Sequence, residues 1–233
     1  EINTLIEDIK DKKGRPLINP PLKNFISVLK TLDAFSNDQK EWEGHRKWMR
    51  QLPLYLELDG IRVVHACWAD PAIEFLKENI PPGKIKKKVF EQIYNDPTSE
   101  LTQNIWLITK GVQLKMPADL KIINNKGVSP RSFRIRWWDH PYGKTFHELS
   151  FESKYELPPY TVPEQIIPDC YPYPAKAPIV FFGHYCRKNG PVIIRPNICC
   201  VDTCVTGTNE LTAYRWDGEE KLNPKNLIRS GKL

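Results

Sequence analysis

The sequence predicts an α/β protein, and three observations support this prediction. Short apolar runs bounded by turn residues are typical of buried strands, and the clearest of them is Ile179–Phe182. Apolar residues recur at helical spacing through most of residues 1–51. Two predicted strands, Ile61–Val64 and Ile179–Phe182, are each followed within two residues by a histidine. Because α/β proteins place functional groups where parallel strands end, this pair of histidines is the main functional signal.

Residues 1–51 are predicted to be helical. Glu1–Lys13 and Leu22–Phe35 each place apolar residues on one helical face. A third helix is expected to begin at Asn37 or Asp38, because either side chain can cap a helix N-terminus. We expect the two tryptophans of this helix to face the core: Trp42 and Trp48.

A hairpin is predicted to follow. Leu54, Leu56 and Leu58 alternate as they would in a strand, and Asp59-Gly60 is a strong two-residue turn signal. The returning strand then ends at His65. A histidine in this position is more often structural than functional, so its weight comes from the pairing with His184.

The stretch from Pro178 to Trp216 contains the second histidine. Its first strand ends in Gly183, and His184 is expected to lie on a loop at the carboxyl edge of a sheet. Ile198–Val205 is predicted to be a further strand that carries Asp202. Asp202 could orient a histidine ligand or cap the end of the strand, and the sequence leaves both open.

The middle of the chain is predicted to contain two helices, three strands and a long extended loop. The loop is rich in proline. In order along the chain, the predicted elements are helices at Pro71–Asn79 and Leu101–Lys110, strands at Gly111–Met116, Leu120–Ile123 and Phe133–Trp138, and the loop at Leu157–Pro178.

Two groups of basic residues are candidates for anion binding. Arg134 and Arg136 fall on one face of a predicted strand, where paired guanidinium groups would suit a phosphate. A surface strand with its charges in solvent is an equally good interpretation of this pair. For the run Lys84–Lys88, a solvated helix face is the better interpretation.

Composition narrows the class of protein. The net charge of +6 suits an anionic partner, but the basic residues are spread along the chain and do not indicate nucleic acid. No apolar stretch is long enough to span a membrane and none has the form of a secretory signal, so we expect a cytoplasmic protein. The six cysteines are then expected to be reduced core thiols, since they lack the paired Cys-x-x-Cys spacing of structural zinc sites.

Four segments, in this order, resemble the C-terminal part of the calcineurin-like metallophosphoesterases. The bacterial branch related to serine/threonine phosphatases and symmetrical diadenosine tetraphosphatases is the most similar. The four segments are Val63-Val64-His65-Ala66-Cys67-Trp68, Phe182-Gly183-His184-Tyr185, Cys200-Val201-Asp202 and Leu211-Thr212-Ala213-Tyr214-Arg215-Trp216.

The resemblance implies a metal-dependent phosphoester hydrolase that uses two divalent ions, Mn, Fe or Zn. His65 and His184 match the two strand-end histidines of the family and are implied metal ligands. Arg136, with Arg134 behind it, is the implied phosphate-binding group, and Asp202 and Tyr185 are implied to support the ligands. The substrate would be a phosphorylated protein or a dinucleoside polyphosphate.

The sequence departs from the family at its N-terminal end. The motifs Gly-Asp-x-His-Gly and Gly-Asp-x-x-Asp-Arg-Gly are absent, and Glu1-Ile2-Asn3 matches only the end of Gly-Asn-His-Glu. Alternatively, Glu1 simply begins a helix with a favourable charge. We therefore expect residues 1–233 to form one incomplete metallophosphoesterase β-sandwich flanked by helices, with its N-terminal strands missing.

Within that domain we expect a helical segment (1–51), a sheet with its insert (52–216) and a loosely held tail (217–233). The chain alone is expected to be inactive. The alternative is a non-catalytic anion- or nucleotide-binding protein that uses Arg134, Arg136 and Lys84–Lys88.

Overall fold

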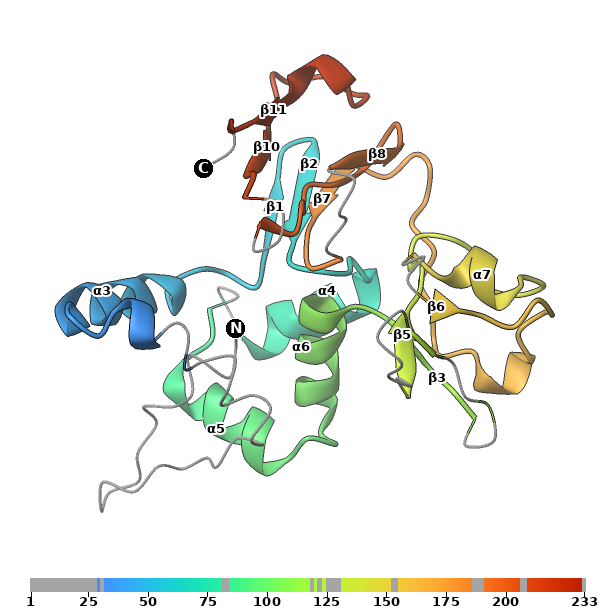
Figure 1. Ribbon diagram of the computed structural model, residues 1–233, viewed down its shortest axis with the longest axis horizontal. Helices are drawn as coiled ribbons and strands as arrows, with labels where there is room; N and C mark the ends of the chain where they lie inside the picture. The colour runs from blue at the N-terminus through green and yellow to red at the C-terminus, as the bar shows by residue number, and fades with distance from the viewer. Residues whose placement is uncertain are drawn as a thin grey trace. The chain divides into compact units, whose positions relative to one another are not determined.

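The computed structural model describes most of the chain and confirms a mixed α/β architecture (Figure 1). The described residues are 29, 32–80, 84–117, 120, 123–124, 131–151, 155–185, 191–205 and 209–231. The first predicted helix therefore lies outside the described residues, as does most of the second, of which residues 29 and 32–34 are helical as predicted.

The chain divides into two compact units, which are taken in turn. The first comprises Glu1–Leu54 and Phe75–Asn104, and the second comprises Tyr55–Glu74 and Ile105–Leu233. The boundary falls within two helices, α4 (Asp70–Asn79) and α6 (Glu100–Lys110), both of which the sequence predicted. No helix in the described part of the chain is both long and apolar enough to cross a bilayer.

Two further helices belong to the first unit: α3 (Gln39–Met49) and α5 (Lys87–Asn95). The Asp38 side chain accepts a hydrogen bond from Glu41 N at 2.8 Å, which confirms Asp38 as the cap of the third predicted helix. Trp42 is buried as expected. The prediction for Trp48 was wrong, because 59% of its surface is exposed.

The centre of the second unit is a mixed five-stranded sheet in the order β1-β2-β7-β9-β8. β1 and β2 form the predicted antiparallel hairpin, β2 and β7 are parallel, and β7 and β9 are parallel. Figure 1 shows β2 and β7 side by side although they are far apart in sequence. The strands are β1 (Tyr55–Leu58), β2 (Ile61–Val64), β7 (Ile179–Phe182), β8 (Val192–Arg195) and β9 (Ile198–Cys200).

One face of this sheet is covered by the C-terminal segment. The buried cluster on that face joins Ile61, Ile179 and Phe181 to Leu222, and Tyr214 packs against Phe181. The segment forms a two-stranded ribbon of β10 (Thr212–Tyr214) and β11 (Leu227–Arg229), with a short helix, η2 (Pro224–Asn226), before β11. The expectation of a loosely held tail was therefore wrong for the described residues.

On the other face, Phe182 contacts the rings of Trp137, Trp138 and Tyr185 at centroid distances of 5.3, 5.4 and 5.5 Å. These aromatic residues come from the long insert between β2 and β7 and from the loop after β7. The insert holds the pairs β3 (Gln113–Lys115) with β5 (Ser132–Arg134) and β4 (Ile123–Asn124) with β6 (Tyr155–Glu156), the short helix α7 (Phe146–Leu149) and η1 (Glu164–Ile166).

Two predicted strands are shorter than expected, and both corrections affect candidate site residues. β5 ends at Arg134, so Arg136 lies beyond the strand instead of on the same strand face. β9 ends at Cys200, so Asp202 and Cys204 lie in the following loop. The proline-rich segment 157–178 is largely irregular, as predicted, and contains only η1.

Candidate functional site

The structure brings the two predicted histidines together. Val64, the last residue of β2, pairs in parallel with Phe182, the last residue of β7, so both strands end at the same edge of the sheet. His65 Nε2 and His184 Nδ1 lie 3.2 Å apart, and the ring planes are inclined by 46°. Residues 119 positions apart in sequence thus meet because two parallel strands end in register.

The backbone around His65 is held from two sides. The carbonyl of Ile108, near the end of α6, accepts hydrogen bonds from Ala66 N at 2.9 Å and Cys67 N at 3.4 Å. Gly183 N donates to His65 O at 3.0 Å, which joins the two histidine loops directly. The loops are therefore fixed relative to each other by backbone contacts.

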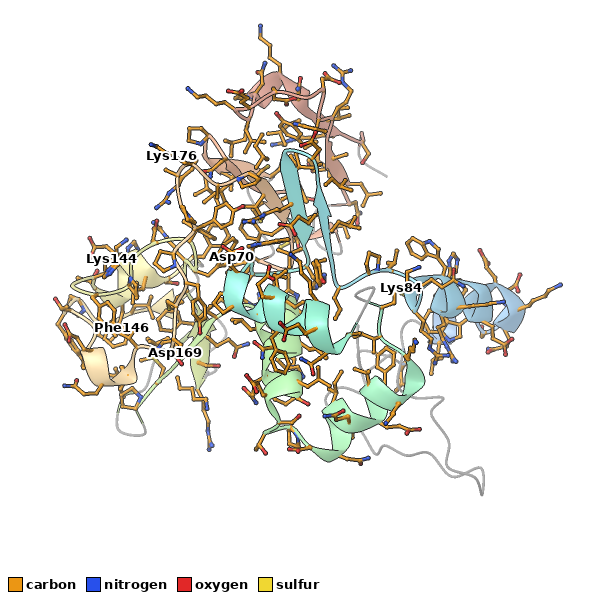
Figure 2. All side chains as sticks on the ribbon, turned by 180° about the vertical axis from the view of Figure 1, so that it is seen from behind. Asp70, Lys84, Lys144, Phe146, Asp169 and Lys176 are labelled. Atoms are coloured by element: carbon orange, nitrogen blue, oxygen red, sulfur yellow. The ribbon has the colours of Figure 1, made fainter. Side chains whose placement is uncertain are left out.

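The loop after His65 is anchored further along by a cluster of charged and aromatic side chains. The Arg62 guanidinium pairs with Asp70 at 3.2 Å and Glu57 at 3.1 Å, and lies 4.8 Å from the ring centroid of Trp68. Trp68 Nε1 donates to the same Asp70 carboxylate at 2.9 Å. Figure 2 shows Asp70 at the beginning of α4, where its negative charge also suits the helix N-terminus.

His184 has a backbone conformation that few residues other than glycine adopt, with φ = 66°. Arg134 stabilises the loop in this conformation, because its Nη1 donates to His184 O at 3.0 Å. Its Nη2 also lies 3.1 Å from His184 Nε2. A single guanidinium therefore holds both the backbone and the ring of this histidine.

Tyr185 lies beneath the site and is fully buried. Its hydroxyl donates to Ile135 O at 3.3 Å, and the Arg134 guanidinium lies 5.7 Å from the centroid of its ring. Burial raises the pKa of the Tyr185 hydroxyl well above its usual value, so the phenol stays neutral. Gly111 follows α6 and has φ = 75°. Because Gly111 has no Cβ, the Tyr185 phenol can approach the Gly111 backbone closely.

The two predicted arginines separate in the structure. Arg134 is the arginine whose guanidinium contacts His184, whereas Arg136 Nε donates to Ser150 O at 3.2 Å, just after α7. Figure 2 shows Phe146, the first residue of α7, in this insert. The resemblance implied Arg136 as the phosphate-binding group with Arg134 behind it, whereas the structure places Arg134 at the histidines.

Asp202 lies beside the histidine loops, but its described hydrogen bond is local. A Cβ added to Gly183 would be 3.7 Å from Asp202 Cβ and 3.7 Å from His65 O. Asp202 Oδ1 accepts from Cys204 N at 2.8 Å and so stabilises the turn after β9, where Cys204 has φ = 57°. Of the two roles left open for Asp202, this contact matches the capping role.

Of the five cysteines that the structure describes, four are reduced thiols. Cys67, Cys170, Cys199 and Cys200 are reduced, as predicted, whereas Cys204 is disulfide-bonded, so the prediction was wrong for Cys204. Cys186 lies outside the described residues. Burial raises the pKa of Cys67 well above its usual value and that of Cys199 to about 12, which disfavours the thiolate form that binds metals.

The histidine pair has the spacing of two ligands on one ion. Two imidazole nitrogens about 2.1 Å from a metal would be about 3.0 Å apart at an octahedral angle and about 3.4 Å apart at a tetrahedral angle. The observed 3.2 Å lies between these values. Among the described residues, no group of three or more His, Cys, Asp or Glu side chains could hold a metal ion, so the pair alone is an incomplete ligand set.

Sequence reasoning missed two residues that support the site: Ile108, whose carbonyl holds the loop after His65, and Gly111, which lies against Tyr185. Gly111 carried a usable signal, because a glycine directly after a predicted helix is typical of a left-handed helix end. No protein-family model, curated protein or solved structure matches the chain.

Proposed function

We propose that His65 and His184 are two ligands of one divalent metal ion in a phosphoester hydrolase. The observation that carries the proposal is the 3.2 Å spacing of His65 Nε2 and His184 Nδ1 at the carboxyl ends of two parallel strands. The resemblance of the sequence around both histidines to metallophosphoesterases supports it. On this proposal the five-stranded sheet is one layer of an incomplete β-sandwich.

The protein residues would contribute position and charge. The histidine pair needs no large rearrangement, since backbone hydrogen bonds from Ala66 and Gly183 already fix both loops. A bound divalent ion would act as a Lewis acid towards phosphate oxygens and supply a nucleophilic water at neutral pH. Arg134 is the proposed phosphate-binding residue, because its planar guanidinium is at the site and suits phosphate oxygens.

Two histidines do not hold two ions, and a two-metal mechanism also needs a bridging carboxylate. We therefore expect this chain to bind metal weakly and to hydrolyse a generic aryl phosphate slowly or not at all. In an intact enzyme of this type the substrate would be a phosphorylated protein or a dinucleoside polyphosphate.

Metal binding tests the proposal directly. Electron paramagnetic resonance of free Mn²⁺ would measure its dissociation constant for the wild type, His65→Asn and His184→Asn. We expect each substitution to weaken Mn²⁺ binding by more than about tenfold, because even the loss of a group that only supports a ligand costs about that much. His147→Asn is the matched control, since His147 is an exposed histidine of the same unit.

An absence of Mn²⁺ binding by the wild type, or an equal loss in His147→Asn, would contradict the proposal. Phosphate binding that persists unchanged in the presence of a chelator would instead favour the non-catalytic anion-binding protein.

A further inference from the structure

The contact between Arg134 and His184 determines which ring nitrogen of the histidine carries the proton. An arginine side chain has hydrogen-bond donors and no acceptor, so His184 Nε2, 3.1 Å from Arg134 Nη2, must be the acceptor. In the neutral ring the hydrogen is then on Nδ1, which donates to His65 Nε2 at 3.2 Å. His65 in turn carries its own hydrogen on Nδ1.

Metal binding requires the ring hydrogen of His184 to be on the other nitrogen, whereas the hydrogen of His65 can stay where it is. This step rests on the proposed function, in which His184 Nδ1 and His65 Nε2 are the ligand atoms. A neutral His184 bound through Nδ1 must carry its hydrogen on Nε2, where it would face an Arg134 N–H across 3.1 Å. Two donors cannot share that contact, whereas His65 already has the arrangement that a ligand needs.

We propose that Arg134 is a two-position residue that either holds His184 Nε2 or binds a phosphate oxygen, and that metal binding selects the second position. The hydrogen bond from Nη1 to His184 O at 3.0 Å does not involve the ring and can persist in both positions. The buried ring of Tyr185 lies under the guanidinium and limits its movement to the neighbourhood of the site. Nη2 then needs a new acceptor, and a phosphate oxygen supplies one.

The exchange balances without any change in net protonation. In a neutral His184 the one ring proton moves from Nδ1 to Nε2 through solvent. The guanidinium keeps its charge and all its protons, and exchanges one hydrogen-bond acceptor for another. Metal and phosphate therefore favour the same position of Arg134, and each must increase the affinity for the other by the same factor.

Mn²⁺ binding with and without inorganic phosphate tests the proposal. In the wild type we expect phosphate to tighten Mn²⁺ binding by at least about fivefold, the lower end of typical coupling between sites. Arg134→Met keeps an unbranched apolar stem over Tyr185 but has no donor, so the coupling should disappear. Mn²⁺ alone should bind this variant more tightly than the wild type, by about tenfold if the Arg134-bound ring makes up about nine-tenths of the metal-free protein.

Arg136→Met is the control, since it removes the same charge from a residue that contacts Ser150. Unchanged coupling in Arg134→Met, weaker Mn²⁺ binding by that variant, or an equal gain in Arg136→Met would overturn the proposal. A wild type that does not bind Mn²⁺ would overturn the proposed function as well. The ¹⁵N chemical shifts of metal-free wild type test the premise separately: we expect His184 Nε2 without a proton, and a protonated Nε2 would refute the two-position role.

Discussion

The substitution Gly111→Ala tests the support beneath the site. A Cβ at this position would lie 2.4 Å from the Tyr185 hydroxyl oxygen and 2.9 Å from two carbons of its ring. The ring has little room to retreat, because Phe151 and Phe182 pack edge-on against it at centroid distances of 5.4 and 5.5 Å. The alanine would also have to adopt φ = 75°.

Two costs determine the expected loss of stability. A left-handed conformation costs an alanine about 1–2 kcal/mol relative to glycine. Displacement of the phenol breaks its hydrogen bond to Ile135 O and leaves a buried polar group without its partner, which costs about 1–3 kcal/mol. The free energy of unfolding should therefore fall by about 2–5 kcal/mol, a large part of the stability of a typical domain.

Urea unfolding of the wild type, Gly111→Ala and Gly143→Ala would measure this loss. Gly143 has φ = 72° and nothing within 4 Å of an added Cβ, so its substitution isolates the backbone cost of about 1–2 kcal/mol. Equal losses in the two variants would show that Tyr185 does not pack on Gly111, and would refute this account of the site.

Two further substitutions test the segments that follow β9. The hydrogen bond from the Tyr214 hydroxyl, with a smaller contribution from Asp217 N, lowers the pKa of Glu219 from 4.5 to about 2. Because the folded-state pKa of Glu219 is depressed, its stabilisation of the fold is present above pH 4.5 and is lost as the pH falls towards about 2. The difference in urea midpoint between the wild type and Glu219→Gln should therefore shrink over this pH range. A difference that stays constant would contradict the prediction. Cys204→Ser removes a disulfide and should lower the free energy of unfolding by about 2–4 kcal/mol under non-reducing conditions. Dithiothreitol should destabilise the wild type but not the variant. A wild type whose stability is unchanged by dithiothreitol would argue against a stabilising disulfide.

The parts of the fold that depend on local sequence were predicted well. The hairpin of β1 and β2 follows from alternating leucines and an Asp-Gly turn, and the cap of α3 follows from one aspartate. The meeting of His65 and His184 was predictable from the rule that parallel strands place their carboxyl ends at one edge. The hairpin and the cap need only a few neighbouring residues, whereas the meeting of the histidines follows from a general rule about two distant parallel strands.

The errors arose where tertiary contacts end or extend an element. Alternation continues through residues 133–137, but the strand stops at Arg134, and a turn closed by Asp139 N and Arg136 O follows. Periodicity cannot locate such an end, since the alternation of side chains does not show where strand pairing stops. The C-terminal segment was misjudged for a related reason: its basic character hid Leu222, which is buried against the distant strands β2, β7 and β9.

The histidine pair and Arg134 differ in how firmly the fold holds them, and this difference bears on the mechanism of the candidate site. Parallel register and backbone hydrogen bonds fix the histidine loops, so the sheet determines how far apart the backbones of the two histidines lie. Arg134 reaches His184 through a long side chain from the edge of a two-stranded sheet, and its contact with the ring is one hydrogen bond. A hydrogen bond from a charged donor contributes about 1.5–3 kcal/mol, and a phosphate oxygen can replace the ring nitrogen as its acceptor without loss of that contribution. On the proposed function, the histidines would form a fixed pair of ligands beside one exchangeable cation, which suits a site that must bind an anion and release it again.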